Sequence, residues 1–286
     1  MLKIDDDKAV IATSSGTTAL HAMLWAIQRQ DGKQRIGTQD FTFASNSIGP
    51  AEGPIVTDMR SDFNLDLDDE YIQMSNLIII TNIFGHLQDF NYISNFNFPY
   101  MILDNAATPY SFWEGTNSCN LGAGSYVSLH HTKPIGFGEG GLAIIDKEYE
   151  DQTRIACNFG IIDGKFNERS GNYKMSELSA AGILQWWDQF NIEELKEKYS
   201  DNYYKILYEL RDEGGIVWQS YGDEDNFFPS CLPYINQTAK NIDDNKTKYE
   251  VRKYYHPLRG FSISTQMYDR VLCYATTEGV DECLKK

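Results

Sequence analysis

The sequence lacks any long apolar run. The longest, around Leu77 to Ile80, is far too short to cross a bilayer, and the acidic start from Met1 to Asp7 has none of the apolar core of a signal peptide. Its five cysteines are odd in number, widely spaced and form no CxxC pair, which makes a disulfide framework or a zinc site unexpected. These absences predict a soluble, cytoplasmic protein with no membrane partner and no bound metal.

Positive charge is also scarce. Against 41 acidic residues there are 25 Lys and Arg, so the 286-residue chain has a formal net charge of −16. Nucleic acids and anionic membranes are bound by basic patches, so neither is an expected partner. An anionic small substrate would have to be held by a few local cations. A hydrophobic content of 42% with 13% aromatic residues is that of an ordinary globular protein.

Short apolar segments alternate with helix-length segments through the first two-thirds of the chain. The expected strands are 9–12, 54–57, 77–81, 100–103, 125–129 and 142–145. A helix with a stripe of Leu20, Met23, Leu24 and Ile27 follows the first of them. Continuous apolar strands separated by helices predict an α/β fold with a mostly parallel sheet flanked by helices.

The pattern changes after Gly171. Helices are expected over 176–188 and 192–211. The remaining expected elements are strands at 216–218, 227–232 and 271–274, a polar helix over 240–254 and a short terminal helix. We interpret this part as a smaller α+β domain joined by the long helix. Residues 1–190 are therefore predicted to form a large domain, and residues 191–286 a small carboxyl-terminal domain.

Lys133 lies in the segment most informative about function. It follows an apolar strand, stands five residues after Ser128, and is followed by four glycines between positions 136 and 141. A partly desolvated lysine favours the neutral amine, the form that attacks a carbonyl, and a nearby hydroxyl can bind phosphate. The alternative is a surface lysine in a glycine-rich hairpin.

Two other segments are compatible with such a site. The run from Ser14 to Thr18 joins a strand to a helix, so its free N–H groups and hydroxyls can form a phosphate cradle; simple N-capping is the alternative. Asp104 ends a buried strand, at the edge of an open α/β sheet where ligands bind. A carboxylate there can keep a pyridine nitrogen protonated, although it can also cap the next turn.

In this order and spacing, the segments resemble those of the DegT/DnrJ/EryC1/StrS family of pyridoxal-phosphate (PLP)-dependent sugar aminotransferases, which have fold type I. The family's S-G-T-x-A-L, T-F, F-S-F-H-x-T-K-x-x-x-x-G-E-G-G and G-x-N-Y-R-M-S-E elements correspond to 15–20, 42–43, 127–141 and 171–177. Weaker similarity covers 154–160, 254–258 and 268–273. The similarity extends from about residue 9 to the end of the chain.

The resemblance implies roles for individual residues around the cofactor ring. Lys133 would form the Schiff base with PLP and then move the proton during transamination. Asp104 would pair with the pyridine nitrogen, and Phe43 would stack on the ring. Asn105 is the alternative if the alignment shifts by one residue, and Thr108 is the nearest counterpart of the family's ring-side glutamine.

The resemblance also implies how the cofactor phosphate is held. Gly16, Thr17 and Ser128 would bind it within one subunit. Asn172 would reach the phosphate of the neighbouring subunit's cofactor, because sites of this family are assembled across a dimer interface. A homodimer with shared active sites is therefore expected.

The reaction implied is transfer of an amino group from glutamate to a keto group of a nucleotide-linked deoxysugar. Dehydratase relatives carry His in place of the Schiff-base lysine, so Lys133 favours amino transfer. The alternative is a non-catalytic or regulatory PLP-binding member, since Met1 lies just before the first strand and the family's amino-terminal segment is missing. A Rossmann-type dinucleotide enzyme fits poorly, because the glycines at 136–141 do not open a helix after the first strand.

Overall fold

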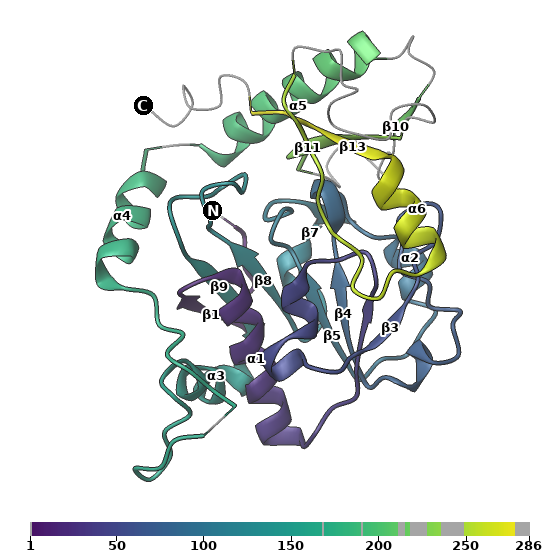
Figure 1. Cartoon of the computed structure of the whole chain (residues 1–286). Coiled ribbons are helices and arrows are strands. Elements are labelled where there is room, and N and C mark those ends of the chain that lie inside the picture. The colour runs from purple at the N-terminus through teal and green to yellow at the C-terminus, as the bar shows by residue number, and fades with distance from the viewer. Residues whose placement is uncertain are drawn as a thin grey trace.

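A seven-stranded sheet forms the centre of the computed structural model, which describes residues 2–167, 169–189, 191–210, 215–217, 228–235 and 249–277. The strand order is β1-β9-β8-β5-β4-β2-β3 (Figure 1). The strands are β1 (Lys8–Thr13), β2 (Ile36–Gln39), β3 (Ile55–Thr57), β4 (Leu77–Thr81), β5 (Tyr100–Asp104), β8 (Gly124–Ser128) and β9 (Gly141–Asp146). Only β9 runs antiparallel to its neighbours, so the predicted, mostly parallel sheet is confirmed.

Helices and turns cover both faces of this sheet. Alternate residues of β4 and β5, such as Ile79 and Ile102, pack with α1 (Gly16–Asp31) and α3 (Glu150–Cys157). The predicted stripe of α1 is completely buried, and each such side chain stabilises the fold by roughly 1.5–3 kcal/mol. The opposite face packs against α2 (Phe90–Ile93) on one side, and against α4 (Glu177–Trp187) and the start of α5 (Ile192–Leu210) on the other.

A second, antiparallel sheet has the order β10-β11-β13-β12 and lies above the first in Figure 1. Its strands are β10 (Ile216–Val217), β11 (Cys231–Ile235), β12 (Val251–Arg252) and β13 (Val271–Ala275). Tyr203, Ile206 and Leu210 of α5 pack on it, and α6 (Ser262–Arg270) leads into β13. The smaller α+β part is thus present, while the boundary between residues 190 and 191 stays a prediction.

Several expectations about this second part need correction. The strand expected at 227–232 begins only at Cys231. The helix expected over 240–254 is wrong at its end, because Val251 and Arg252 pair with β13; residues 240–248 and the terminal helix lie outside the described residues. Helix α6 and strand β2 were missed, since both are mainly polar and carry no apolar run of their own.

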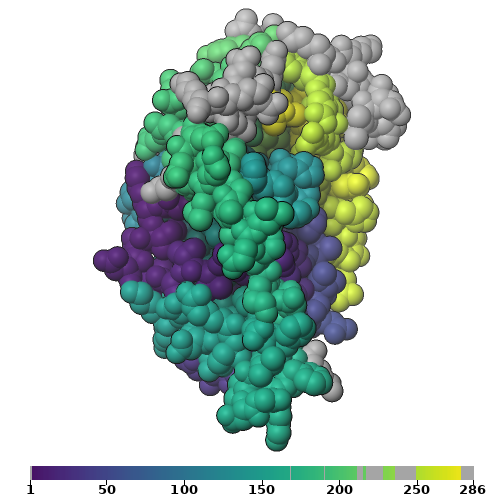
Figure 2. Space-filling model, turned by 90° about the vertical axis from the view of Figure 1, so that its left-hand side faces the viewer, coloured from purple at the N-terminus to yellow at the C-terminus, as the bar shows by residue number. Residues whose placement is uncertain are grey.

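Smaller elements complete the described chain. They are the hairpin β6 (Phe112–Trp113) and β7 (Thr116–Asn117) and the 3-10 turns η1 (Ala44–Ser47), η2 (Gly49–Ala51), η3 (Ile72–Met74), η4 (Ile83–Gly85), η5 (Ser118–Asn120) and η6 (Lys147–Tyr149). Figure 2 shows the segment from α3 to α4 running along the side of the molecule that lies at the left in Figure 1. No helix in the described part of the chain is long and apolar enough to cross a membrane.

The two sheets share a hydrophobic cluster. Phe41, Phe63 and Phe84 of the first part pack edge to face or tilted against one another, and Cys231 and Val271 of the second sheet join them. This cluster fixes the second sheet over the carboxyl ends of the parallel strands. The segment before α6 therefore becomes one wall of the cavity described next.

Candidate active site

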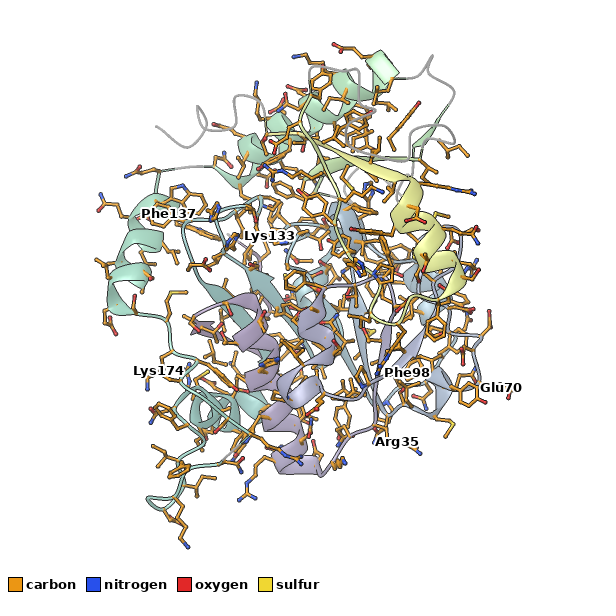
Figure 3. The ribbon with its side chains drawn as sticks, viewed as in Figure 1. Arg35, Glu70, Phe98, Lys133, Phe137 and Lys174 are labelled. Carbon is orange, nitrogen blue, oxygen red and sulfur yellow. The ribbon has the colours of Figure 1, made fainter. Side chains whose placement is uncertain are left out.

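A cavity of about 560 Å³ opens at the carboxyl ends of the parallel strands. It brings together six of the seven predicted site residues: Gly16, Thr17, Phe43, Asp104, Ser128 and Lys133. Asn172 is not among its lining residues. It is exposed and forms an isolated β-bridge with Asn158. Figure 3 shows Lys174, two positions further along the chain, well below Lys133 and at the left edge of the molecule.

Lys133 is presented by the tight loop that joins β8 to β9. Its N–H donates to the carbonyl oxygen of His130 at 2.8 Å, and its own carbonyl accepts from Gly136 at 2.9 Å. An added Cβ at Gly136 would stand 1.9 Å from the carbonyl oxygen of His130, so the loop requires glycine there. Lys133 is half-buried and lines the cavity. This favours the reactive-lysine interpretation over that of a surface lysine in a hairpin.

The cavity changes the acid–base properties of Lys133. Burial is the largest influence and lowers the pKa of its amine, while the charges of Asp104 and Cys231 act in the opposite direction. The net effect is a lowered pKa, which increases the fraction of neutral, nucleophilic amine at a given pH.

Asp104 ends β5 and is 3% exposed. One carboxylate oxygen accepts from the N–H of Ala106 at 3.0 Å, as the turn-capping alternative predicted, while the other accepts from the hydroxyl of Thr81 at 3.4 Å. Burial raises the pKa of Asp104, against the effects of Tyr126, Ala106 and Lys133. Asn105 is fully buried, and its side-chain oxygen accepts from Asn82, so the geometry favours Asp104 as the acid at the cavity.

Behind Asp104 lies a polar network that sequence reasoning missed. The hydroxyls of Thr42 and Thr81 are 2.5 Å apart, and the amide nitrogen of Asn46 donates to Thr42 at 2.8 Å. The hydroxyl of Tyr126 donates to the side-chain oxygen of Asn46 at 2.9 Å. Tyr126 lies inside an apolar strand, where the sequence pattern indicates only a core position. The network fixes the acid end of the cavity, because each hydroxyl and amide has a partner.

The amino terminus of α1 forms another wall. Ser15 and Thr18 make a reciprocal capping box, with the hydroxyl of Ser15 accepting from the N–H of Thr18 at 3.1 Å. The capping alternative is therefore correct for these two residues. The N–H groups of Gly16 and Thr17, at the first two helical positions, have no intrahelical acceptor and line the cavity. A helix end of this kind binds anions.

Close packing at this helix end excludes side chains. An added Cβ at Gly16 would lie 3.2 Å from the Cβ of Ser128. At Gly141 it would lie 2.3 Å from the carbonyl carbon of Ser15, which is backbone and cannot move aside easily. The lysine-bearing loop and the helix end are thus in direct contact, and a small anion can reach both Ser128 and the free N–H groups.

The segment between β12 and α6 supplies the remaining wall through Lys253, Tyr254, Tyr255 and His256, none of which was assigned a site role from the sequence. The similarity at 254–258 was the available signal. Lys253 donates to the carbonyl oxygens of Tyr268 and Asp269 at 2.6 and 2.9 Å. Phe43 is 58% exposed at the cavity rim, so its stacking role stays a prediction.

Comparisons with known proteins agree with this geometry. The profile of the DegT/DnrJ/EryC1/StrS aminotransferase family matches residues 4–257. Among solved structures, a DegT DnrJ EryC1 StrS aminotransferase from Brucella abortus is similar with TM-score 0.73 and 18% identity, covering 99% of this chain and 85% of that chain. A protein described as the sugar aminotransferase Spr1654 of Streptococcus pneumoniae, in its PMP form, has TM-score 0.76 and 15% identity over 96% and 86% of the two chains. DesI, crystallised in the presence of its TDP-sugar product, has TM-score 0.71 and 20% identity over 96% and 78%.

The cavity residues fit PLP. An amine with a lowered pKa, a buried carboxylate and the backbone N–H groups at a helix end match the aldehyde, ring nitrogen and phosphate of that cofactor. The solved structures share the fold of this chain, and the profile match extends over most of its length. The chain belongs to the DegT/DnrJ/EryC1/StrS aminotransferase family, whose members are PLP-dependent sugar aminotransferases.

Proposed function

We propose that this enzyme transfers an amino group from glutamate to a keto group of a nucleotide-linked deoxysugar. The observation that carries the proposal is the meeting of Lys133, Asp104 and the free end of α1 in one cavity. The similarity to DesI, crystallised with its TDP-sugar product, supports a nucleotide-linked substrate. Glutamate as donor rests on the family resemblance, and the cytoplasmic location on the cysteine content.

Lys133 and Asp104 divide the acid–base work. Bound PLP supplies the electron sink that makes a proton on the neighbouring carbon acidic. Lys133 Nζ holds the cofactor between turnovers and moves that proton during amino transfer, as a general base and then a general acid. Asp104 stays ionised opposite a positive charge on the ring nitrogen, because that charge offsets the cost of burying the carboxylate.

The remaining predicted residues bind and orient. Gly16 and Thr17 donate their backbone N–H groups, and Ser128 its hydroxyl, to the cofactor phosphate. Phe43 covers one ring face at the cavity rim. Asn172, exposed and outside this cavity, serves the site of a second copy, so the active protein is a homodimer. Residues 1–190 form the cofactor domain in this proposal, and 191–286 the small domain.

Borohydride trapping tests the central assignment. The protein is loaded with PLP, reduced and digested, and the pyridoxyl-labelled peptide is identified by mass spectrometry. We expect the label on Lys133 and its loss in Lys133→Ala, whereas Lys165→Ala, which changes an exposed lysine, keeps it. A label on another lysine, or an unchanged label in Lys133→Ala, contradicts the proposal.

Substrate choice needs a separate measurement. The absorbance band of the loaded protein should shift on adding glutamate and return on adding a keto nucleotide-sugar, but not the same keto sugar without its nucleotide. A shift with glutamate and recovery with both sugars would argue against nucleotide recognition. A band that no amino donor changes would instead support the cofactor-binding protein without turnover.

A further inference from the structure

Three side chains with metal-binding atoms gather on the loop that carries Lys133. Their ligand atoms, one each from His130, His131 and Glu139, all lie within 4.8 Å of one another. The rings of the two histidines are 4.1 Å apart between centroids. The expectation of no metal site rested on the spacing of the cysteines and did not consider these residues.

The distances are close to those of a tetrahedral metal site. Zinc binds histidine nitrogen and carboxylate oxygen at about 2.0–2.2 Å, which places neighbouring ligand atoms roughly 3.3–3.5 Å apart. His130 Nε2 and Glu139 Oε1 are 3.4 Å apart. His131 and Glu139 are exposed, so a small side-chain rotation can bring His131 to the same distance. Two histidines and one glutamate also form the ligand set of known zinc sites with an open fourth position.

The second nitrogen of His130 contacts Thr132 twice. His130 Nδ1 lies 2.8 Å from the hydroxyl of Thr132 and accepts from the backbone N–H of Thr132 at 3.3 Å. Metal binding at Nε2, the nitrogen that faces Glu139, requires that nitrogen to be unprotonated, and the ring proton can then lie on Nδ1 and be donated to the hydroxyl of Thr132. Thr132 is the residue directly before Lys133, so the site is mechanically connected to the reactive amine.

The site also touches the cavity. His130, Thr132, Lys133 and Glu139 line it, whereas His131 does not. An ion bound to His130 and Glu139 would tie together the first and last parts of the lysine-bearing loop and place positive charge at the cavity wall. His131 occupies the variable position of the H-x-T-K element, so the third ligand is not part of the family pattern.

We propose that His130, His131 and Glu139 bind one divalent transition-metal ion of the zinc class, and that the bound ion inhibits the enzyme. The two imidazole ligands select zinc, nickel or copper rather than magnesium or calcium, which prefer sites made of oxygen ligands. Inhibition follows because the ion ties together two parts of the loop that carries Lys133 and places positive charge at the wall of the cavity that Lys133 lines. Metal binding itself is independent of the proposed sugar substrate and can be measured without turnover.

The test is a zinc titration of the PLP-loaded protein at pH 7.5, after removal of metals and alkylation of accessible thiols. Competition with a chromogenic zinc indicator gives the affinity and stoichiometry. We expect one zinc ion per chain, an affinity at least tenfold weaker in His131→Asn, and an unchanged affinity in His256→Asn, which alters a histidine on the opposite cavity wall. Magnesium should not compete.

Activity gives the second readout. Zinc should inhibit the unmodified enzyme at the concentration that fills the site, and a chelator should restore the rate. His131→Asn should keep its basal activity and lose the inhibition. Three results would overturn the proposal: no stoichiometric binding, equal zinc affinity in His131→Asn, or full activity with the site filled. Because binding is measured directly, an inactive preparation would bear on the proposed function and leave the metal result intact.

Discussion

The carboxylate of Asp58 accepts hydrogen bonds from both the backbone N–H and the hydroxyl of Ser264, at 2.9 and 2.6 Å, across 206 residues of sequence. It also accepts from the N–H of Ile263 at 2.8 Å. Asp58 thereby satisfies the free N–H groups at the start of α6 from a distant part of the chain. Asp40 does the same for the preceding segment, with bonds from Arg259 and Phe261. These two carboxylates hold the segment that carries His256 against the cavity.

Removing this anchor should destabilise the protein. Asp58→Asn weakens the three charge-assisted hydrogen bonds to the start of α6 and should lower the free energy of unfolding by about 1–3 kcal/mol, whereas Ser264→Ala removes one donor and should cost about 1 kcal/mol. Urea unfolding checks both, with the exposed Asp6→Asn as control. If Asp58→Asn unfolds like the control, the carboxylate does not hold α6.

The contribution of Asp58 should depend on pH. Burial alone would raise the pKa of Asp58, but hydrogen bonds from Ser264, Ile263 and Met59 together outweigh burial and lower it. A carboxyl with a lowered folded pKa stabilises the protein above its unfolded pKa of about 3.9, and this stability is lost as pH falls through the folded value. The difference between the wild type and Asp58→Asn should therefore be constant above about pH 5 and shrink below pH 4.

In the cofactor-free protein the ionised carboxylate of Asp104 should lower the free energy of unfolding, whereas that of Asp58 raises it. Burial is the main cause of the raised pKa of Asp104, so the ionised carboxylate costs stability at pH 7, and this cost disappears as pH falls through the folded value towards about 3.9. Asp104→Asn should unfold at higher urea than the wild type without PLP, yet lose at least about 100-fold in activity. A cofactor-free variant less stable than wild type would contradict this account.

The same substitution should change Lys133. The charge of Asp104 raises the pKa of Lys133 against the larger lowering effect of burial, so its removal should lower that pKa further. The rate at which the cofactor-free protein binds PLP can be followed by absorbance as a function of pH. The midpoint of this pH dependence should lie at lower pH in Asp104→Asn than in the wild type. An unchanged midpoint would show that the two groups are not electrostatically linked.

Glycine at position 141 should be far less replaceable than at position 16. An alanine Cβ at 141 meets the backbone of Ser15 at 2.3 Å, whereas at 16 it meets the Cβ of Ser128 at 3.2 Å. Gly141→Ala should therefore weaken PLP binding at least about tenfold by displacing the lysine loop from α1, since interiors repack only partly around added atoms. Gly16→Ala should bind PLP more nearly normally. Equilibrium dialysis compares them, and similar affinities would rule out the close contact as a requirement.

Much of the fold was predictable because its signals are local. The apolar runs of β4 and β5 and the apolar stripe of α1 can be recognised from residues close together in the sequence, and the structure confirms them. Helix α6 was not predictable, because its sequence is polar and its start is fixed by Asp58, more than 200 residues away. The same applies to β12, whose two residues become a strand only through pairing with β13.

In the candidate site, too, the residues with local sequence signals were predicted and those joined only by long-range contacts were missed. Lys133, Asp104 and the α1 terminus follow strand ends, where topology alone places ligand-binding residues. Tyr126 and Asn46 were missed because a buried polar network has no sequence period, and its members are joined only by the folded sheet. Asn172 stays a prediction, because a single chain leaves it exposed and outside the cavity.

Mixing two inactive variants tests the role of Asn172 directly. Lys133→Ala removes the amine, and Asn172→Asp should repel the cofactor phosphate and reduce activity strongly. If Asn172 serves the partner's site, a mixed dimer of the two variants has one site with both native residues and one with neither. An equal mixture reassembled at random contains half mixed dimers, so activity should return to about a quarter of the wild-type value. If Asn172 instead acts within its own chain, both sites of the mixed dimer carry a substitution and no activity returns.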